Sequence, residues 1–183
     1  SASVVCGYLT NNASRTPESV AEHLTSLGLQ VEPHDVVTSP QAAVRVLADL
    51  IPAGSLVLVV GGEGLIREVE NAGFRVTFLA DDKPAAVIQG FSPELGWKHL
   101  AEASFALQRD ENCVWVATNT DWTIPVEKGV APGNGTLVSA VHLAVGRLAT
   151  FAGKPEKPLF DVARERFSAS QKPLMVGDRL DTD

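Results

Sequence analysis

Three groups of polar residues along the chain have the chemistry needed to hold a phosphoryl group. Thr10, Asn11 and Asn12 follow the apolar segment VVCGYL, and a hydroxyl with two carboxamides can donate hydrogen bonds to an anion without adding charge. Lys154 stands between a glycine and a proline, at the end of a helical pattern. Each group alone has an ordinary alternative, because Asn and Thr favour turns and caps and a lysine at a helix end complements the helix dipole.

The third group lies in the segment MVGDRLDTD. Asp178 directly follows an apolar segment and Gly177, so we expect it at the end of a buried strand. Mg²⁺ takes one or two protein carboxylates, with water and phosphate oxygens completing an octahedron. We expect Asp178 to bind this ion and Asp183 to return toward it through a turn, whereas Asp181 fits a solvated turn residue. Together the three groups supply the charge neutralisation, orientation and metal that phosphoryl transfer requires.

The apolar segments that precede these residues must position them. Short segments rich in Val and Leu alternate with helical patterns and predict strands in VVCGYLTN, SLVLVVGG, RVTFLADD, AAVIQGF, VWVATNTD and PLMVGD. Strands that are apolar throughout and alternate with helices are typical of a parallel sheet covered on both faces. The sequence therefore predicts an α/β fold, in which ligands bind at the carboxyl edge of the sheet.

Apolar residues at helical spacing predict three of the helices. The first helix begins after the N-cap residue Thr16 and stops at Gly28. The residues that mark the other two are Val44, Leu47 and Ile51 in the second helix and Leu137, Val141, Ala144 and Leu148 in the third.

A glycine-rich turn follows one of the predicted strands. The segment VLVVGGEGLIREVENAGFRVTFLADD has the order of strand, glycine turn, helix and strand that dinucleotide-binding units have. If Gly61 opens the G-x-G-x-x-G pattern, Glu63 and Ile66 occupy the other glycine positions. If Gly62 opens it, Arg67 occupies the third position. We therefore expect an ordinary turn between strand and helix here, not a nucleotide site.

Composition narrows the class of protein. The 183 residues are 45% hydrophobic, enough to bury a sizeable core. No apolar segment approaches the roughly 18 residues that span a bilayer, and no signal-peptide pattern is visible, so we expect a cytoplasmic protein without membrane contact. With 15 basic and 22 acidic residues, the net charge of -7 argues against nucleic acid as a partner. Cys6 and Cys113 lie apart in hydrophobic segments and are expected to be buried, reduced thiols.

The order of the polar motifs resembles the haloacid dehalogenase superfamily: Thr in LTNN, Lys in GKP, then GDRLDTD. The segments TNNASRTPESVAEHL and VATNTDWTIPVEKGVAPGNGTLVSAV are similar to the branch that contains NagD-type, 4-nitrophenyl-phosphate, phosphoglycolate, pyridoxal-phosphate and glycerol-phosphate phosphatases. Within this branch the chain is most similar to actinobacterial glycerol-3-phosphate phosphatases. The resemblance covers nearly the whole chain.

This resemblance implies a Rossmann-like core, incomplete in this chain, with an inserted α/β cap domain. Residues 1–36 and 126–183 would belong to the core and residues 37–125 to the cap. Proline- and glycine-rich stretches near residues 33–40 and 123–136 fit these boundaries. The cap would close over the site, and because caps in this family often pair, a homodimer is expected.

The resemblance also implies a Mg²⁺-dependent phosphatase of small phosphate monoesters that forms an aspartyl-phosphate. The implied catalytic residues are Thr10, Asn11 and Lys154, and the implied metal ligands are Asp178 and Asp183, the latter directly or through water. Candidates for binding the substrate are Asn12, Asn119 and Asp121. Trp122 would either pack at the domain junction or help to shape the pocket.

One departure from the family pattern changes the expectation. The family's nucleophile is an aspartate in a D-x-D-G segment before the threonine segment, and none of the nine residues before Thr10 is acidic. The family also continues beyond the acidic loop. We therefore expect these residues to be an excerpt of a longer protein that carries the nucleophile. The alternative is a non-catalytic or regulatory binder of a phosphorylated metabolite.

Overall fold

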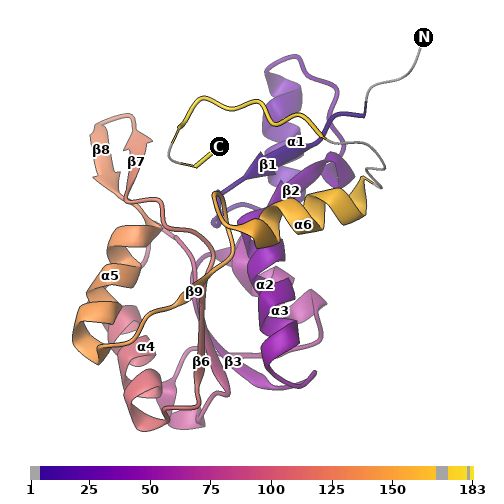
Figure 1. Ribbon diagram of the computed structural model, residues 1–183. Coiled ribbons are helices and arrows are strands. Elements are labelled where there is room, and N and C mark those ends of the chain that lie inside the picture. The colour runs from indigo at the N-terminus through magenta and orange to yellow at the C-terminus, as the bar shows by residue number, and fades with distance from the viewer. Residues whose placement is uncertain (1–4, 168–172, 181) are drawn as a thin grey trace.

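The computed structural model describes residues 5–167, 173–180 and 182–183, and its central feature is a parallel sheet of five strands (Figure 1). The strand order is β4-β3-β5-β6-β9, and all neighbouring strands are parallel. The strands are β3 (Leu56–Val60), β4 (Arg75–Thr77), β5 (Ala86–Gln89), β6 (Val114–Ala117) and β9 (Thr150–Phe151). The predicted α/β fold with parallel pairing is confirmed.

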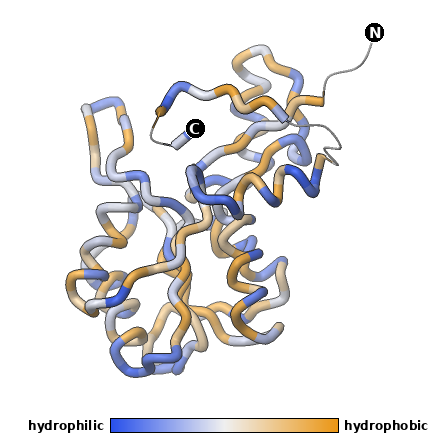
Figure 2. Tube along the Cα trace, in the orientation of Figure 1, coloured by the Kyte–Doolittle hydropathy of each residue, from blue (hydrophilic) through white to orange (hydrophobic). Residues whose placement is uncertain are grey.

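Helices cover both faces of this sheet. One face is covered by α2 (Ser39–Leu50), α3 (Glu63–Asn71) and α6 (Lys157–Arg166), and the other by α4 (Trp97–Arg109) and α5 (Asn134–Val145). Successive side chains of β3 alternate between the two cores, Val57 and Val59 toward the first and Leu58 and Val60 toward the second. Figure 2 shows the resulting hydrophobic centre and the hydrophilic outer loops.

A smaller parallel sheet lies beside the large one. It pairs β1 (Tyr8–Thr10) with β2 (Val36–Thr38) and packs against α1 (Pro17–Ser26). Short 3₁₀ turns span Pro33–Asp35 and Ala80–Asp82, and an antiparallel hairpin joins β7 (Thr123–Val126) to β8 (Gly129–Pro132). In the described part of the chain, the helices are all too short or too polar to cross a membrane.

The predicted helix boundaries are partly right. Thr16 caps α1 by accepting a hydrogen bond from the Ser19 N–H, and Gly28 follows the helix with a φ of 93°. The prediction that Leu148 belongs to α5 is wrong, because Gly146 adopts a φ of 71° and ends the helix. Leu148 lies beyond that stop and is exposed.

The glycine-rich turn before α3 serves packing. A Cβ on Gly64 would lie 2.5 Å from the carbonyl oxygen of Arg15, and a Cβ on Gly62 would lie 3.4 Å from Cα of Ser14. At Gly64 the start of α3 therefore approaches the chain that leads into α1 more closely than a side chain would allow, whereas Gly62 leaves room for an ordinary van der Waals contact. The close approach accounts for Gly64 without a nucleotide.

The predicted strand in PLMVGD does not form. Residues 173–178 pair with no described strand, and Leu174 and Val176 are exposed. An apolar segment becomes a strand only where a neighbouring edge can pair with its N–H and C=O groups. Among the described strands, β1 pairs only with β2. Asp178 therefore follows an exposed, irregular segment rather than a buried strand.

The division into residues 1–36, 37–125 and 126–183 remains a prediction. The described sheets cross both of its boundaries, since β2 begins at Val36 and pairs with β1, and β9 pairs with β6 after the boundary at residue 125. The second boundary falls within the β7–β8 hairpin.

The two cysteines differ in their surroundings. Cys113 is buried against α4 and α5 as predicted, whereas Cys6 precedes β1 and is exposed, so that the prediction is wrong for Cys6. Burial raises the pKa of the Cys113 thiol to about 11.

The α2 helix offers a matched test of the core. Leu47 is fully buried and Leu50, one turn further on, is half exposed. We expect Leu47→Ala to lower the free energy of unfolding by about 2–5 kcal/mol through lost burial and a cavity, and Leu50→Ala by less than about 1 kcal/mol. Equal losses in urea titrations would contradict this packing.

The thiols offer a second test. At pH 8 we expect a disulfide reagent to modify Cys6 within minutes and to leave Cys113 unmodified, because a thiol with a pKa near 11 carries little thiolate at that pH and this one is also buried. Unfolding in urea should make both thiols reactive, as counted by mass spectrometry. Rapid native labelling of Cys113 would be inconsistent with its burial.

Candidate active site

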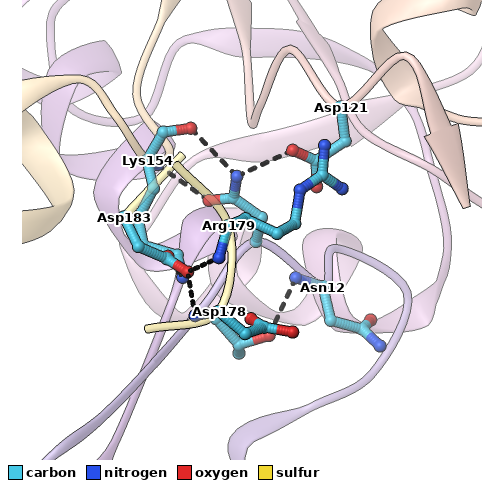
Figure 3. A network of polar contacts seen from close by, with 8 residues as sticks. Asn12, Asp121, Lys154, Asp178, Arg179 and Asp183 are labelled. Carbon is cyan, nitrogen blue, oxygen red and sulfur yellow. Dashed lines mark hydrogen bonds and ion pairs between the residues drawn. The ribbon is translucent and has the colours of Figure 1, made fainter. Parts of the chain in front are cut away.

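The carboxyl ends of the two parallel sheets meet, and their loops form one polar network (Figure 3). Asn11 follows β1, Asn119 follows β6, and Lys154 follows β9. The Asn119 Nδ2 donates to the carbonyl oxygen of Asn11 over 2.8 Å, and the Lys154 N–H donates to Asn11 Oδ1 over 2.8 Å. Residues far apart in the sequence are thus joined at the edge where ligands of such sheets bind.

Asn11 is the centre of this network. Its side-chain Nδ2 donates to Asp121 Oδ1 and to the carbonyl oxygen of Lys154, each over 3.0 Å. The residue is 8% exposed. The structure therefore places Asn11 at the carboxyl end of β1, and both of its side-chain N–H groups donate within the protein.

Thr10 and Asn12 form a tight turn after β1. The Thr10 hydroxyl oxygen accepts from the Asn12 N–H over 3.1 Å, which leaves its O–H to donate outward. Asn12 Oδ1 accepts from the N–H groups of Ser14 and Arg15. Asn12 thus has the turn role that is usual for asparagine, and Thr10 keeps a donor for a ligand.

Lys154 lies in a loop after β9, so the prediction of a helix end is wrong. The preceding strand β9 is only two residues long, too short to show an apolar pattern of its own. The Lys154 side chain is 13% exposed, and its Nζ donates to the carboxylate of Asp183, whose side chain is 8% exposed. This contact brings the predicted cation and the predicted acidic loop together.

Asp183 closes the acidic loop. Its Oδ2 accepts from the N–H groups of Asp178 and Arg179 over 3.2 and 3.1 Å. A Cβ on Gly177 would lie 2.4 Å from the Asp183 side chain, so glycine allows this closure. Asp181 lies outside the described residues.

The hydrogen bond from Lys154 holds the pKa of the Asp183 carboxyl below its ordinary value. Because the folded-state pKa is lowered, this interaction stabilises the loop above the ordinary pKa of aspartate. The stabilisation is lost as the pH falls through the lowered value.

The acidic loop fits a magnesium ion through Asp178. The Asp183 carboxylate is already engaged by Lys154 and two N–H groups, whereas Asp178 is exposed. Within residues 5–167, 173–180 and 182–183, no group of three His, Cys, Asp or Glu side chains could hold a metal. One carboxylate with water and phosphate oxygens is an arrangement that Mg²⁺ commonly adopts.

The loop after β6 connects the site to the β7–β8 hairpin. The Asp121 N–H donates to Asn119 Oδ1 over 3.0 Å. Its carbonyl oxygen would lie 2.2 Å from a Cβ on Gly133, so the glycines of APGNGT allow a close approach. Trp122 is exposed, so its indole does not pack into the core of the described residues.

Sequence reasoning missed three members of the network. Ser39 Oγ donates to the carbonyl oxygen of Asn11 over 2.9 Å. A Cβ on Gly153 would lie 2.6 Å from Asn11 Oδ1. The side chain of Arg179 extends toward Asp121 (Figure 3). The motifs GKP and GDRLD contain Gly153 and Arg179, so the sequence could have indicated these two residues. A serine at the start of a helix predicts a cap, so nothing in the sequence indicated the contact of Ser39.

Comparison with known proteins identifies the family. Residues 1–75 match a model described as haloacid dehalogenase-like hydrolase, and residues 151–183 match a second HAD-hydrolase-like model. The solved structure of a double mutant of the thermostable NPPase from Geobacillus stearothermophilus superposes with a TM-score of 0.89 at 32% identity, covering 97% of this chain and 70% of that one. The chain belongs to the haloacid dehalogenase-like hydrolases. This confirms the family that the motif order predicts.

Other haloacid dehalogenase-like relatives are longer than this chain. The D-glycerol 3-phosphate phosphatase of Mycobacterium tuberculosis is 46% identical over 178 residues, which cover 96% of this chain and 49% of that protein. A crystal structure of a glycerol phosphate phosphatase from Mycobacterium tuberculosis with magnesium has a TM-score of 0.93 at 44% identity, over 98% of this chain and 54% of that one. The glycerol-3-phosphate phosphatase of Gallus gallus is 37% identical over 96% of this chain and 63% of that protein. The chain thus spans about half the length of the mycobacterial proteins.

Gly153 offers a test of the close packing around Lys154. A Cβ there would lie 2.4 Å from the carbonyl oxygen of Thr118 and 2.6 Å from Asn11 Oδ1. We expect Gly153→Ala to lower the free energy of unfolding by about 1–3 kcal/mol. Gly96→Ala is the control, because a Cβ on Gly96 meets nothing within 4 Å, and we expect a loss below about 1 kcal/mol from the weaker helix cap. Equal losses in thermal unfolding would be inconsistent with the approach of these loops.

Proposed function

We propose that the protein containing this chain is a Mg²⁺-dependent phosphatase of small phosphate monoesters. The observation that carries the proposal is the network that joins Asn11, Lys154 and the acidic loop of Asp178 at the carboxyl edges of two parallel sheets, with Thr10 directly before Asn11. A hydroxyl donor, a cation and an available carboxylate are the groups that phosphoryl transfer needs.

Each residue has a role that its surroundings support. The Thr10 O–H would donate to an oxygen of the phosphoryl group, because its oxygen already accepts from Asn12. The Lys154 ammonium would offset the negative charge that the phosphoryl group brings. Asp178 would hold Mg²⁺, which supplies further charge neutralisation when bound.

The reaction would follow the covalent route that the family resemblance implies. By resemblance to the family, the first aspartate of a D-x-D-G segment would attack phosphorus, and the bond from phosphorus to the substrate oxygen would break as that oxygen takes a proton from the second aspartate, which acts as the general acid. Water would then cleave the aspartyl-phosphate and release inorganic phosphate. This route divides one difficult displacement into two easier ones.

Glycerol phosphate is the first substrate to test, because the mycobacterial and chicken relatives named above are glycerol phosphate phosphatases. Homodimerisation through the cap is part of the same proposal, by family resemblance. Light scattering of the intact protein would measure it.

The test is phosphate release by the intact protein from glycerol 3-phosphate, phosphoglycolate, pyridoxal phosphate and 4-nitrophenyl phosphate. We expect Mg²⁺-dependent turnover that EDTA abolishes and added Mg²⁺ restores. Calorimetry of the same protein would measure the binding of Mg²⁺ and inorganic phosphate. If both bind but none of the compounds is hydrolysed, the protein is a non-catalytic binder of phosphorylated metabolites and the phosphatase proposal is refuted.

Two substitutions test the site. We expect Lys154→Ala and Asp178→Asn each to lower kcat by at least about 10²-fold, because each removes a charge aimed at the reacting group. Lys157→Ala and Asp161→Asn are the matched controls, since these residues form an exposed ion pair on α6. The controls should retain normal turnover. Near-normal activity of Lys154→Ala or Asp178→Asn, in folded protein, would refute the assignment.

A further inference from the structure

Asn11 joins four segments of the chain through both its side chain and its backbone. Its carbonyl oxygen accepts from Ser39 Oγ and Asn119 Nδ2, and its carboxamide contacts Lys154 and Asp121. These partners lie in three other segments of the described chain. Asn11 is therefore held in one position, since losing any of these partners would leave a buried polar group unpaired.

The contact with Lys154 has a particular geometry. The Asn11 carboxamide accepts from the Lys154 N–H and donates to the Lys154 carbonyl oxygen, over 2.8 and 3.0 Å. These two bonds fix the peptide groups on either side of the lysine Cα. At the other end of the side chain, Nζ is held by Asp183. The flexible side chain of Lys154 is thus held at both ends, by Asn11 at its backbone and by Asp183 at its ammonium group.

The contact with Asp121 brings in the loop after β6. An ionised carboxylate only accepts hydrogen bonds, so the second N–H of Asn11 Nδ2 is directed to it over 3.0 Å. Asp121 is further held by Asn119, whose side chain also reaches Asn11. The loop Asn119–Asp121 therefore docks on the residue that fixes Lys154.

We propose that Asn11 is a positioning residue, which holds Lys154 in place and makes that placement depend on the docking of the loop Asn119–Asp121. Asn11 acts on the phosphoryl group only through Lys154. Asp121 is connected to Lys154 through the Asn11 carboxamide, so a change at Asp121 changes the position of the cation. The inference rests on the proposed function for its kinetic part, and its structural part can be measured without turnover.

The structural part is tested by hydrogen exchange of the Lys154 amide in the intact protein, followed by NMR. We expect Asn11→Ala to raise the exchange rate of this amide at least about tenfold, since its acceptor is removed. Ser104→Ala is the control, because Ser104 is also buried and its hydroxyl donates to Leu100 O within α4. The control should leave the Lys154 amide unchanged. Unchanged protection in Asn11→Ala would overturn the positioning role, whether or not the protein is a phosphatase.

The kinetic part is tested by combining substitutions. We expect Asn11→Ala to lower kcat by about 10–100-fold with KM within about threefold, because misplacing the lysine weakens its contact in the transition state. In a Lys154→Ala background the same substitution should cost less than about threefold. A full effect in that background would mean that Asn11 contacts the phosphoryl group itself, and would overturn the proposal. If the Lys154→Ala protein has no measurable turnover, the affinity for inorganic phosphate measured by calorimetry replaces kcat in this comparison.

The dependence on the loop is tested at Asp121. Asn at this position can still accept the bond from Asn11, so we expect Asp121→Asn to keep kcat within about fivefold of wild type. Asp121→Ala should lower kcat at least about tenfold, and adding Asn11→Ala should cause little further loss. Independent, multiplying effects of Asn11→Ala and Asp121→Ala would exclude coupling through the carboxamide.

Discussion

A parallel sheet must have both faces covered, and this constraint shapes the whole chain. The central strands β3, β5 and β6 are buried on both sides, so their segments are apolar and helices must return across each face. The loops at the strand ends are therefore where polar residues of several strands come together. The carboxyl ends of the large and small sheets face each other, and the uncovered loops between them carry Thr10, Lys154 and Asp121. The location of the candidate site thus follows from the layer architecture.

The sequence was sufficient for the architecture because burial leaves a local signal. Apolar segments of four or five residues predicted the strands, and Thr16 and Gly28 marked the ends of α1 through capping chemistry that involves near neighbours only. The PLMVGD segment shows the limit of this signal. Its composition suits a strand, but a strand also needs a neighbouring edge, and composition says nothing about which edges are present.

The internal contacts of the site could not be predicted for a related reason. The types of residue at Thr10, Lys154 and Asp178 indicate chemistry, and their order indicates a family. The hydrogen bonds of Asn11 to Lys154 and Asp121 connect loops that follow different strands. Which loops lie close together depends on how the strands pair in the folded sheets, and the sequence does not give that pairing. Ser39 is an example. A serine at the start of a helix predicts a capping role, but the Ser39 hydroxyl donates to the carbonyl oxygen of Asn11 in another segment.

The separation between Asn11 and Lys154 has a consequence for synthesis of the chain. These residues are 143 positions apart, whereas β3, α3 and β4 are consecutive and can pair as soon as they leave the ribosome. Contacts between distant residues form late because a long loop must close first. Until Lys154 is made, the carboxamide of Asn11 has none of its bonds to that residue. We therefore expect strands β3 to β6 to assemble before the site does, so that a newly made chain acquires most of its fold first and its chemical competence last.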